Sequence, residues 1–376
     1  MLFITKPVAD AMQTQTASDP SFLDHRVSAY YRERVQDSWS GGHIMKGREP
    51  KAEDIQMVSN DYLRLSQHPA IVERKSEALL AGGHDVLRSD VFRSDNSPMR
   101  RFEQELAAVM GAEDTMICQS GWNANVGLIQ SIANPETPVY LDMYAHTSMW
   151  EGAKSAGAPA KPFRHNDAAS LEKLIAKFGP GVVAVDAVYS TSGTLGALPD
   201  IVDVATAGGC VILVDESHSL GLFGPHGAGL VAKLGLSDRV HFTTGSLSKA
   251  FASRGGIIAG SARNIEYLRY ESLPAIFSSG MLPHEAIGFS ATLELIVKAD
   301  EGRRHLQANA DYLRNGLSAL GYNLDASHTQ ILSLVAGTEQ QTLVLRDALE
   351  SRGVFGAVFC APTTAKNRAL VRFSVH

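Results

Sequence analysis

Cysteine is scarce in this chain, with only three residues among 376. Cys118, Cys210 and Cys360 lie far apart in the sequence, and no two of them form a CxxC pair. An odd number of cysteines without such pairs argues against a disulfide framework and against a zinc ribbon. Buried free thiols are the expected state of all three.

The chain also lacks long apolar runs and any excess of positive charge. No stretch approaches the ~20 apolar residues that span a bilayer, and the opening MLFITKPVADAMQTQ has no basic region followed by an apolar segment, as a secretory signal would. The formal net charge is −6, which gives no overall field to attract nucleic acid or an anionic membrane. We therefore expect a cytoplasmic protein that binds neither nucleic acid nor membranes, and that binds any anion locally.

Clustered metal ligands are lacking as well. Asp142 and His146 lie four residues apart in DMYAH, but no third ligand follows at a usual spacing. The HEAIG stretch at His284 lacks the second histidine of an HExxH motif. The sequence therefore predicts no metal site.

Helical periodicity is present in several segments. In residues 97–111 apolar side chains recur at spacings of three and four, Ser97 can cap the first turn, Pro98 suits its start, and Gly111 can close the end. This pattern predicts a helix. Residues 71–83 have a similar form, and the stretch 283–320 is predicted as a long helix.

Short apolar runs lie between these helices, namely VVAVDAVYS, CVILVDESHS, VHFTTGS and GGIIAGS. Runs without polar alternation favour strands that are buried on both faces, as in a mostly parallel, doubly wound sheet. Ligands of such sheets bind at the carboxyl ends of the strands. Because these runs finish in polar residues, among them Ser190, His218 and Lys249, we expect the polar ends to converge.

The length exceeds what one hydrophobic core usually supports, so more than one domain is expected. We predict an N-terminal segment over 1–58, a large α/β domain over 59–285 and a smaller α+β domain over 286–376. The last residues, ALVRFSVH, have strand character to the end. A truncated chain and a short natural version both fit this ending.

The tract TTGSLSKAFASRGG, residues 243–256, contains a single lysine among small and hydroxyl residues. A P-loop needs glycine directly before its lysine and Ser or Thr directly after it. Here Ser248 precedes Lys249 and Ala250 follows, so a nucleotide-phosphate loop is disfavoured. We expect Lys249 to act through its amine.

Two other stretches could supply partners for that amine. ICQSGWNANVGL predicts a strand end, then Ser120 and Gly121, then a helix from about Trp122, which together could bind a phosphate; alone, the pattern is equally typical of a plain turn. VILVDESHSLG places Asp215 at the end of an apolar strand, where a carboxylate needs a cation or a strong donor. A salt bridge to a core arginine is the structural alternative for Asp215. Together, a lysine, a strand-end carboxylate and an anion site form the set that pyridoxal 5′-phosphate (PLP) requires.

The order SGW, DMYAH, VDESHSLG and SLSKAF resembles that of the α-oxoamine synthases, fold-type I PLP enzymes that join an amino acid to an acyl-CoA with loss of carbon dioxide. The resemblance extends from SNDYLRL at residue 59 to LVRFSV at residue 370. Stretches such as AHTSMWEGA, PAIFSS and GVFGAVFC are most similar to the quorum-sensing autoinducer synthases of the cholera type, which make α-aminoketone or α-hydroxyketone signals. The resemblance implies an α/β fold-type I transferase with a mostly parallel sheet.

The same resemblance implies PLP as cofactor and four catalytic residues. Lys249 would form the Schiff base, and Asp215 would face the pyridine nitrogen. His146 would stack on the ring, while His218, together with Ser190, would approach its phenolic oxygen.

Further residues match the family's binding positions. Those for the phosphate are Ser120, Gly121, Trp122 and Ser246. Ser278 and Ser279 would contact the phosphate of a neighbouring subunit, which implies a homodimer with shared active sites. Those for the substrate are Asn60, Tyr62 and Arg372, of which Arg372 would receive the amino-acid carboxylate as a planar bidentate donor.

Substrate choice stays open in the sequence. Relatives from the biotin and threonine pathways carry an acidic SMDGD-like stretch where this chain has STSGT at residues 190–194, which weakens any carry-over of their substrate choice. A medium- or long-chain acyl-CoA and an amino acid are expected, with S-adenosylmethionine or 2-aminobutyrate as the donor. The alternatives are other α-oxoamine synthases of the 2-amino-3-ketobutyrate, 8-amino-7-oxononanoate or sphingoid-base type. From another class, a non-catalytic nucleotide-binding or regulatory protein remains an alternative.

Overall fold

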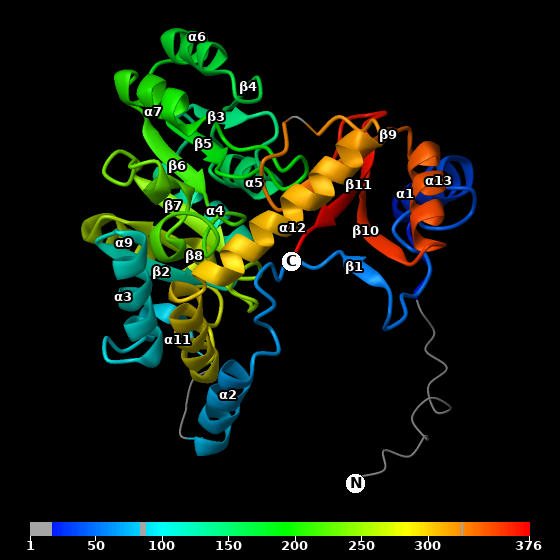
Figure 1. The fold of residues 1–376 in the computed structure, drawn as a ribbon. Helices are drawn as coiled ribbons and strands as arrows, with labels where there is room; N and C mark the ends of the chain where they lie inside the picture. Colours follow the sequence, from blue (N-terminus) through cyan, green and yellow to red (C-terminus); the bar gives the residue numbers. More distant parts are fainter. Residues whose placement is uncertain (1–16, 83–87, 325) are drawn as a thin grey trace.

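The computed structural model describes residues 17–82, 88–324 and 326–376, which contain two β-sheets with helices around them (Figure 1). The opening stretch MLFITKPVADAMQTQ, which carries the prediction that there is no secretory signal, lies outside the described residues. The larger sheet has seven strands in the spatial order β2 (Asp114–Cys118), β8 (Gly256–Gly260), β7 (Phe242–Ser246), β6 (Val211–Asp215), β5 (Val182–Asp186), β3 (Val139–Asp142) and β4 (Ala160–Phe163).

The prediction of a mostly parallel sheet is confirmed. β8 pairs antiparallel with β2 and with β7, while the remaining neighbours pair in parallel. Both faces are buried, because successive residues alternate between two core clusters: in β5, Val182 and Ala184 join one cluster, and Val183 and Val185 join the other. The four apolar runs each contain one of these strands: β5, β6 and β7 take part in parallel pairs, as expected for strands covered on both sides, whereas β8, from GGIIAGS, is antiparallel to both neighbours.

The helices around the larger sheet have the following bounds: α2 (Pro69–Ala81), α3 (Pro98–Met110), α4 (Gly121–Ile132), α5 (Thr147–Ser155), α6 (Ala168–Phe178), α7 (Leu198–Ala207), α8 (Leu230–Lys233), α9 (Ala262–Glu271), α10 (Leu273–Ile276) and α11 (Pro283–Val297). The helix predicted over 97–111 is confirmed as α3. The Ser97 hydroxyl accepts from the Arg100 N–H, and Gly111 has the left-handed φ of 70° that a closing glycine adopts. For the helix predicted over 71–83, Gly83 lies outside the described residues.

The prediction of a single long helix over 283–320 is wrong, because the helix is interrupted between the end of α11 and the start of α12 (Asp300–Ala319). At the break, the N–H groups of Lys298 and Ala299 bond to carbonyls only three residues back. The two helices serve different cores: α11 packs against α2 and α3, whereas Leu306 of α12 joins the cluster of the smaller sheet. Figure 1 shows α12 running from one sheet toward the other.

The smaller sheet has four strands in the order β1 (Ile55–Met57), β10 (Val354–Phe359), β11 (Ala369–Ser374) and β9 (Ile331–Gly337), and α13 (Glu339–Glu350) packs on it. The strand character of ALVRFSVH is confirmed as β11. β1 comes from the predicted N-terminal segment, and α11 begins before the predicted boundary at residue 286. The division into 1–58, 59–285 and 286–376 stays a prediction.

The remaining described elements are α1 (Ser21–Ala29), a π-helix (Tyr30–Ser38) and two short 3₁₀ turns (Asp90–Phe92 and Pro225–Gly227). Within the described part of the chain, no helix is long and apolar enough to cross a bilayer, and no group of metal-ligating side chains gathers. The three cysteines are buried and unpaired, as predicted.

Candidate active site

The polar ends of neighbouring strands meet at the carboxyl edge of the larger sheet. Asp215, the last residue of β6, lies in register with Asp186 of β5 and with Thr244 of β7. Two residues beyond this level, the Ser246 N–H donates to the Ser217 hydroxyl over 2.9 Å. The polar ends therefore converge at one edge, as the strand pattern predicts.

Asp215 is buried among neutral donors. Asn125 Nδ2 donates to its Oδ2 over 2.6 Å, and the Ser217 N–H donates to its Oδ1 over 2.8 Å. The Asn125 amide also accepts from Thr244 Oγ1 over 2.6 Å. No arginine or lysine forms an ion pair with Asp215 among the residues that the structure describes, so the core-arginine alternative is wrong. The carboxylate is left available to a cationic group in the site.

His146 lies at the start of α5 and is connected to Asp215 through two side chains. Its Nδ1 lies 2.7 Å from Ser148 Oγ, which accepts from Asn125 Nδ2 over 2.9 Å. The His146 backbone N–H donates to Asp186 over 3.0 Å. Desolvation lowers the pKa of His146, Asp215 opposes that shift and Lys249 adds to it. The ring is therefore held in place and favoured in its neutral form.

Asp186 is a second buried carboxyl beside Asp215. Burial, with the neighbouring Asp215 charge, raises the pKa of Asp186 well above its usual value. The His146 backbone N–H is the one donor described for the side chain of Asp186 and only partly opposes this shift. The protonated form of Asp186 is therefore favoured.

Lys249 lies in the turn after β7 and is half-buried. Its amine makes no hydrogen bond or ion pair with the described residues. Burial lowers the pKa of Lys249, the Arg372 charge lowers it further, and Asp215 opposes both. An unpaired amine of lowered pKa fits covalent attachment to an aldehyde.

The start of α4 packs directly against the end of β7. A methyl group placed on Gly121 would lie 2.8 Å from Ser246 Cβ, and one on Gly256 would clash with the Ser120 carbonyl. Ser120 caps α4 by accepting from the Asn123 N–H over 3.1 Å. The glycines thus bring the N–H groups of a helix start beside two serine hydroxyls, which suits a phosphate.

Trp122 follows Gly121 and is 43% exposed. Its ring meets the His146 ring edge to face at 6.1 Å. The structure therefore brings the predicted stacking residue and the predicted phosphate-binding stretch side by side.

Arg372 of β11 faces the larger sheet from the smaller one. Its Nη1 donates to the Ser190 carbonyl over 2.9 Å, and its Nη2 donates to Asn60 Oδ1 over 3.1 Å. The guanidinium lies 4.6 Å from the centre of the Phe359 ring. Its Nε is buried without a partner in the described residues. This arrangement leaves a buried donor for a further acceptor, such as a carboxylate.

Tyr62 and His218 form a buried contact next to Arg372. Tyr62 Oη lies 2.7 Å from His218 Nδ1, and 3.2 Å from Asn60 Oδ1. The predicted substrate residues Asn60, Tyr62 and Arg372 therefore form one connected group that reaches His218.

Ser278 and Ser279 lie just beyond α10. The Ser278 hydroxyl donates to the Pro274 carbonyl, and the Ser279 carbonyl accepts from Gln119 Nε2 over 2.9 Å. The segment thus lies beside the SGW stretch of its own chain. Its contact with the phosphate of a neighbouring subunit stays a prediction.

Sequence reasoning missed Asn125, Ser148, Thr244 and Asp186. Asn125 had a signal, because it is a polar residue one helical turn after Gly121 on the face that α4 buries. Asp186 also had one, since VVAVD ends in a carboxylate at the same register as VILVD. Ser148 and Thr244 belong to the site only through their hydrogen bonds to Asn125, and no sequence pattern marks either residue.

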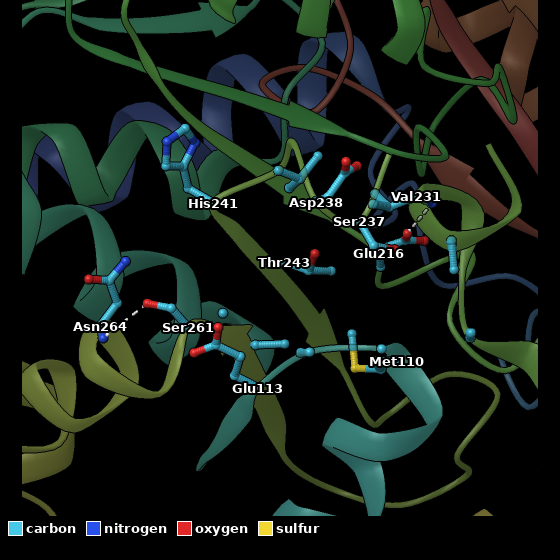
Figure 2. Close-up of a pocket in the computed structure, with 17 residues that line it drawn as sticks. Met110, Glu113, Glu216, Val231, Ser237, Asp238, His241, Thr243, Ser261 and Asn264 are labelled. Carbon is cyan, nitrogen blue, oxygen red and sulfur yellow. Dashed lines mark hydrogen bonds between the residues drawn. The ribbon is translucent and has the colours of Figure 1, made fainter. Parts of the chain in front are cut away.

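A separate cavity of about 520 Å³ lies between the end of α3, α8 and the start of α9 (Figure 2). It is lined by Met110, Glu113, Val231, His241 and Asn264 among others, and by none of the predicted site residues. Glu216 points toward it and accepts from the N–H groups of Leu230 and Val231. Although Asp215 and Glu216 are adjacent in the sequence, Asp215 therefore lies in the candidate active site and Glu216 at the separate cavity.

Comparison with known proteins agrees with this geometry. The model of the family "Aminotransferase class I and II" matches residues 52–376. A CAI-1 autoinducer synthase from Vibrio campbellii is 43% identical over 357 residues, which cover 95% of this chain and 91% of the relative. The 8-amino-7-oxononanoate synthase 1 of Bacillus velezensis is 34% identical over 332 residues, with coverage of 86% and 84%. A solved serine palmitoyltransferase from S. paucimobilis, in a complex that contains PLP and myriocin, aligns with a TM-score of 0.84 at 25% identity over 94% of this chain and 92% of that chain.

The chain therefore belongs to the aminotransferase class I and II family, and it is an α/β fold-type I enzyme whose cofactor is PLP. Within that family it groups with the α-oxoamine synthases, which are acyltransferases, and it is more similar to the CAI-1 autoinducer synthase than to the oxononanoate synthase above.

Proposed function

We propose that this enzyme condenses a medium- or long-chain acyl-CoA with an amino acid or S-adenosylmethionine, with loss of carbon dioxide, to give an α-aminoketone precursor of a quorum-sensing signal. The 43% identity to a CAI-1 autoinducer synthase supports the signal as the product class. The observation that carries the reaction type is the convergence of three groups: the unpaired amine of Lys249, the donor-bound Asp215 and the buried Arg372.

The site residues fit the cofactor, because an amine, a carboxylate and a helix start with hydroxyls lie at one edge of the sheet. Lys249 would hold the aldehyde carbon, Asp215 the pyridine nitrogen, and Gly121 with Ser246 the phosphate. When bound, PLP supplies an electron sink for the negative charge that develops at the substrate α-carbon.

Proton transfer falls to Lys249. Its amine nitrogen has a lowered pKa, so a larger share of it is neutral and able to accept the α-proton at physiological pH. Asp215 would hold the proton on the pyridine nitrogen, since Asn125 and the Ser217 N–H stabilise its charge. Lys249 would therefore act where negative charge develops, at the substrate α-carbon, and Asp215 where that charge is accommodated, at the pyridine nitrogen.

Substrate orientation falls to the residues around Arg372. The guanidinium would bind the carboxylate of the amino donor through its unpartnered Nε and the adjacent nitrogen. His146 would hold the cofactor ring from one side, and His218 would donate to a reacting oxygen. Because Arg372 would hold the carboxylate in one position, it would also orient the carbon–carbon bond that breaks when carbon dioxide leaves.

We also propose that the enzyme works as a homodimer with shared active sites. The segment that carries Ser278 and Ser279 presents Phe277 at 80% exposure, and the neighbouring 3₁₀ turn presents Phe92 at 69%. Ser89 Oγ donates to the Ile276 carbonyl over 2.7 Å, so the two apolar groups belong to one surface. A surface of this kind favours a protein partner. The cytoplasmic location stays a prediction.

The proposal is tested by incubating PLP-loaded enzyme with a panel of acyl-CoAs and amino donors. CoA release is followed by thiol titration, and products are identified by mass spectrometry. We expect α-aminoketones, with faster turnover for medium and long acyl chains than for acetyl-CoA. Products made only with glycine and acetyl-CoA, with pimeloyl donors and alanine, or with serine would each assign a different α-oxoamine synthase reaction and contradict the proposal.

A further inference from the structure

The contact between Tyr62 and His218 is enclosed by protein. Tyr62 is 1% exposed and His218 is 5% exposed, and their polar atoms lie 2.7 Å apart. Gln330 Nε2 donates to the His218 carbonyl over 2.9 Å, which fixes the backbone of the turn that carries the ring. Water is thus largely kept from the pair, so that the hydroxyl and the imidazole Nδ1 must find their hydrogen-bond partners within the protein.

The hydrogen bonds of Asn60 indicate whether Tyr62 Oη or His218 Nδ1 carries the shared proton. Its Oδ1 already accepts from Arg372 Nη2 over 3.1 Å and from Ser374 Oγ over 3.3 Å. An amide oxygen has two lone pairs, and arginine can only donate. Tyr62 Oη lies farther from this oxygen, at 3.2 Å, than from His218 Nδ1. The Tyr62 O–H therefore points to His218 Nδ1.

Both members of the pair are neutral. Burial raises the pKa of Tyr62 to about 12, so the phenol keeps its proton. Burial lowers the pKa of His218 well below its usual value, and the charges of Lys249 and Arg372 add to that effect. A neutral imidazole carries one N–H, and a ring whose Nδ1 accepts must carry it on Nε2.

We propose that Tyr62 is a positioning residue that holds His218 in the tautomer with its proton on Nε2, so that His218 acts as a hydrogen-bond donor in the site and never as its base. His218 Nε2 makes no hydrogen bond within the described residues and is available to a bound molecule. The consequence for catalysis rests on the proposed function: His218 donates to an oxygen of cofactor or thioester, and the α-proton is left to Lys249. The tautomer itself does not depend on that function.

The tautomer is measured by ¹⁵N NMR of histidine-labelled protein, with PLP bound and after PLP is removed. The His218 signals are assigned from their loss in His218→Gln. In the wild type we expect an unprotonated Nδ1 and a protonated Nε2. In Tyr62→Phe, which lacks the donor, we expect the two nitrogens to shift toward values averaged between tautomers.

Tyr140→Phe is the matched control, because Tyr140 is an equally buried phenol that donates to the Gly179 carbonyl. It should leave the His218 signals unchanged, and thermal unfolding checks that all three variants fold. A wild-type His218 with its proton on Nδ1 would overturn the proposal, and so would an unchanged tautomer in folded Tyr62→Phe. If Tyr62→Phe does not fold, the wild-type spectrum still decides. Failure of the product assay leaves this result intact, so the two proposals fail separately.

Discussion

Asn125 Nδ2 lies 2.6 Å from Asp215 Oδ2 and ties the first turns of α4 to the end of β6. The same helix starts at Gly121, where the phosphate would lie. One helix would therefore fix both the proposed phosphate site and Asp215, the carboxylate that we propose for the opposite end of the cofactor. The spacing of these two groups is set by the packing of α4 on the sheet.

Asn125→Ala is expected to weaken this arrangement. Loss of the amide leaves the buried Asp215 and Thr244 short of a partner, which costs about 1–3 kcal/mol. We expect a lower free energy of unfolding and weaker PLP binding, measured by urea denaturation and by absorbance titration. Asn123→Ala, on the same helix but not bonded to Asp215, is the control. Equal losses in the two variants would contradict a specific role for Asn125.

Arg372→Lys is expected to raise the KM for the amino donor with little change in PLP binding. Lysine offers no planar pair of donors, and disrupting a desolvated charge pair typically costs about 2–5 kcal/mol, or at least roughly 30-fold in affinity. Steady-state kinetics at saturating acyl-CoA give the value. Arg368→Lys, an exposed change just before β11, should have no effect. An unchanged KM in Arg372→Lys would remove this residue from the substrate site.

His218 is expected to make the protein less stable in mild acid. Its pKa in the folded protein lies well below the usual value of 6.5, so between these two values the unfolded chain binds a proton that the folded chain does not. Stability is therefore full above about pH 6.5 and falls as pH decreases, by up to about 1.4 kcal/mol per pH unit.

Urea unfolding on either side of that pH, with and without His218→Gln, measures this contribution. The variant should lose less stability on acidification than the wild type. An identical loss in both proteins would show that His218 is not the group responsible.

The sequence predicted the parts of the site that lie at the ends of strands, and it missed the parts that connect elements. Asp215 and Lys249 stand out because a charged residue follows an apolar run. Asn125 forms its bond with a residue ninety positions later, and no local pattern encodes that distance. The break after Val297 was missed for a related reason, since both segments have helix-forming sequences and the separate cores that α11 and α12 join are not encoded locally.

The central claim is that Lys249 performs the chemistry, and the Lys249→Ala variant tests it most directly. PLP-loaded wild type, Lys249→Ala and the control Lys233→Ala, which removes an exposed lysine of α8, are given an acyl-CoA and an amino donor, and the ketone is quantified by mass spectrometry. We predict that Lys249→Ala stays folded and loses turnover by roughly 100-fold or more, while Lys233→Ala matches the wild type. A folded Lys249→Ala protein that still forms the ketone at the wild-type rate would contradict the account.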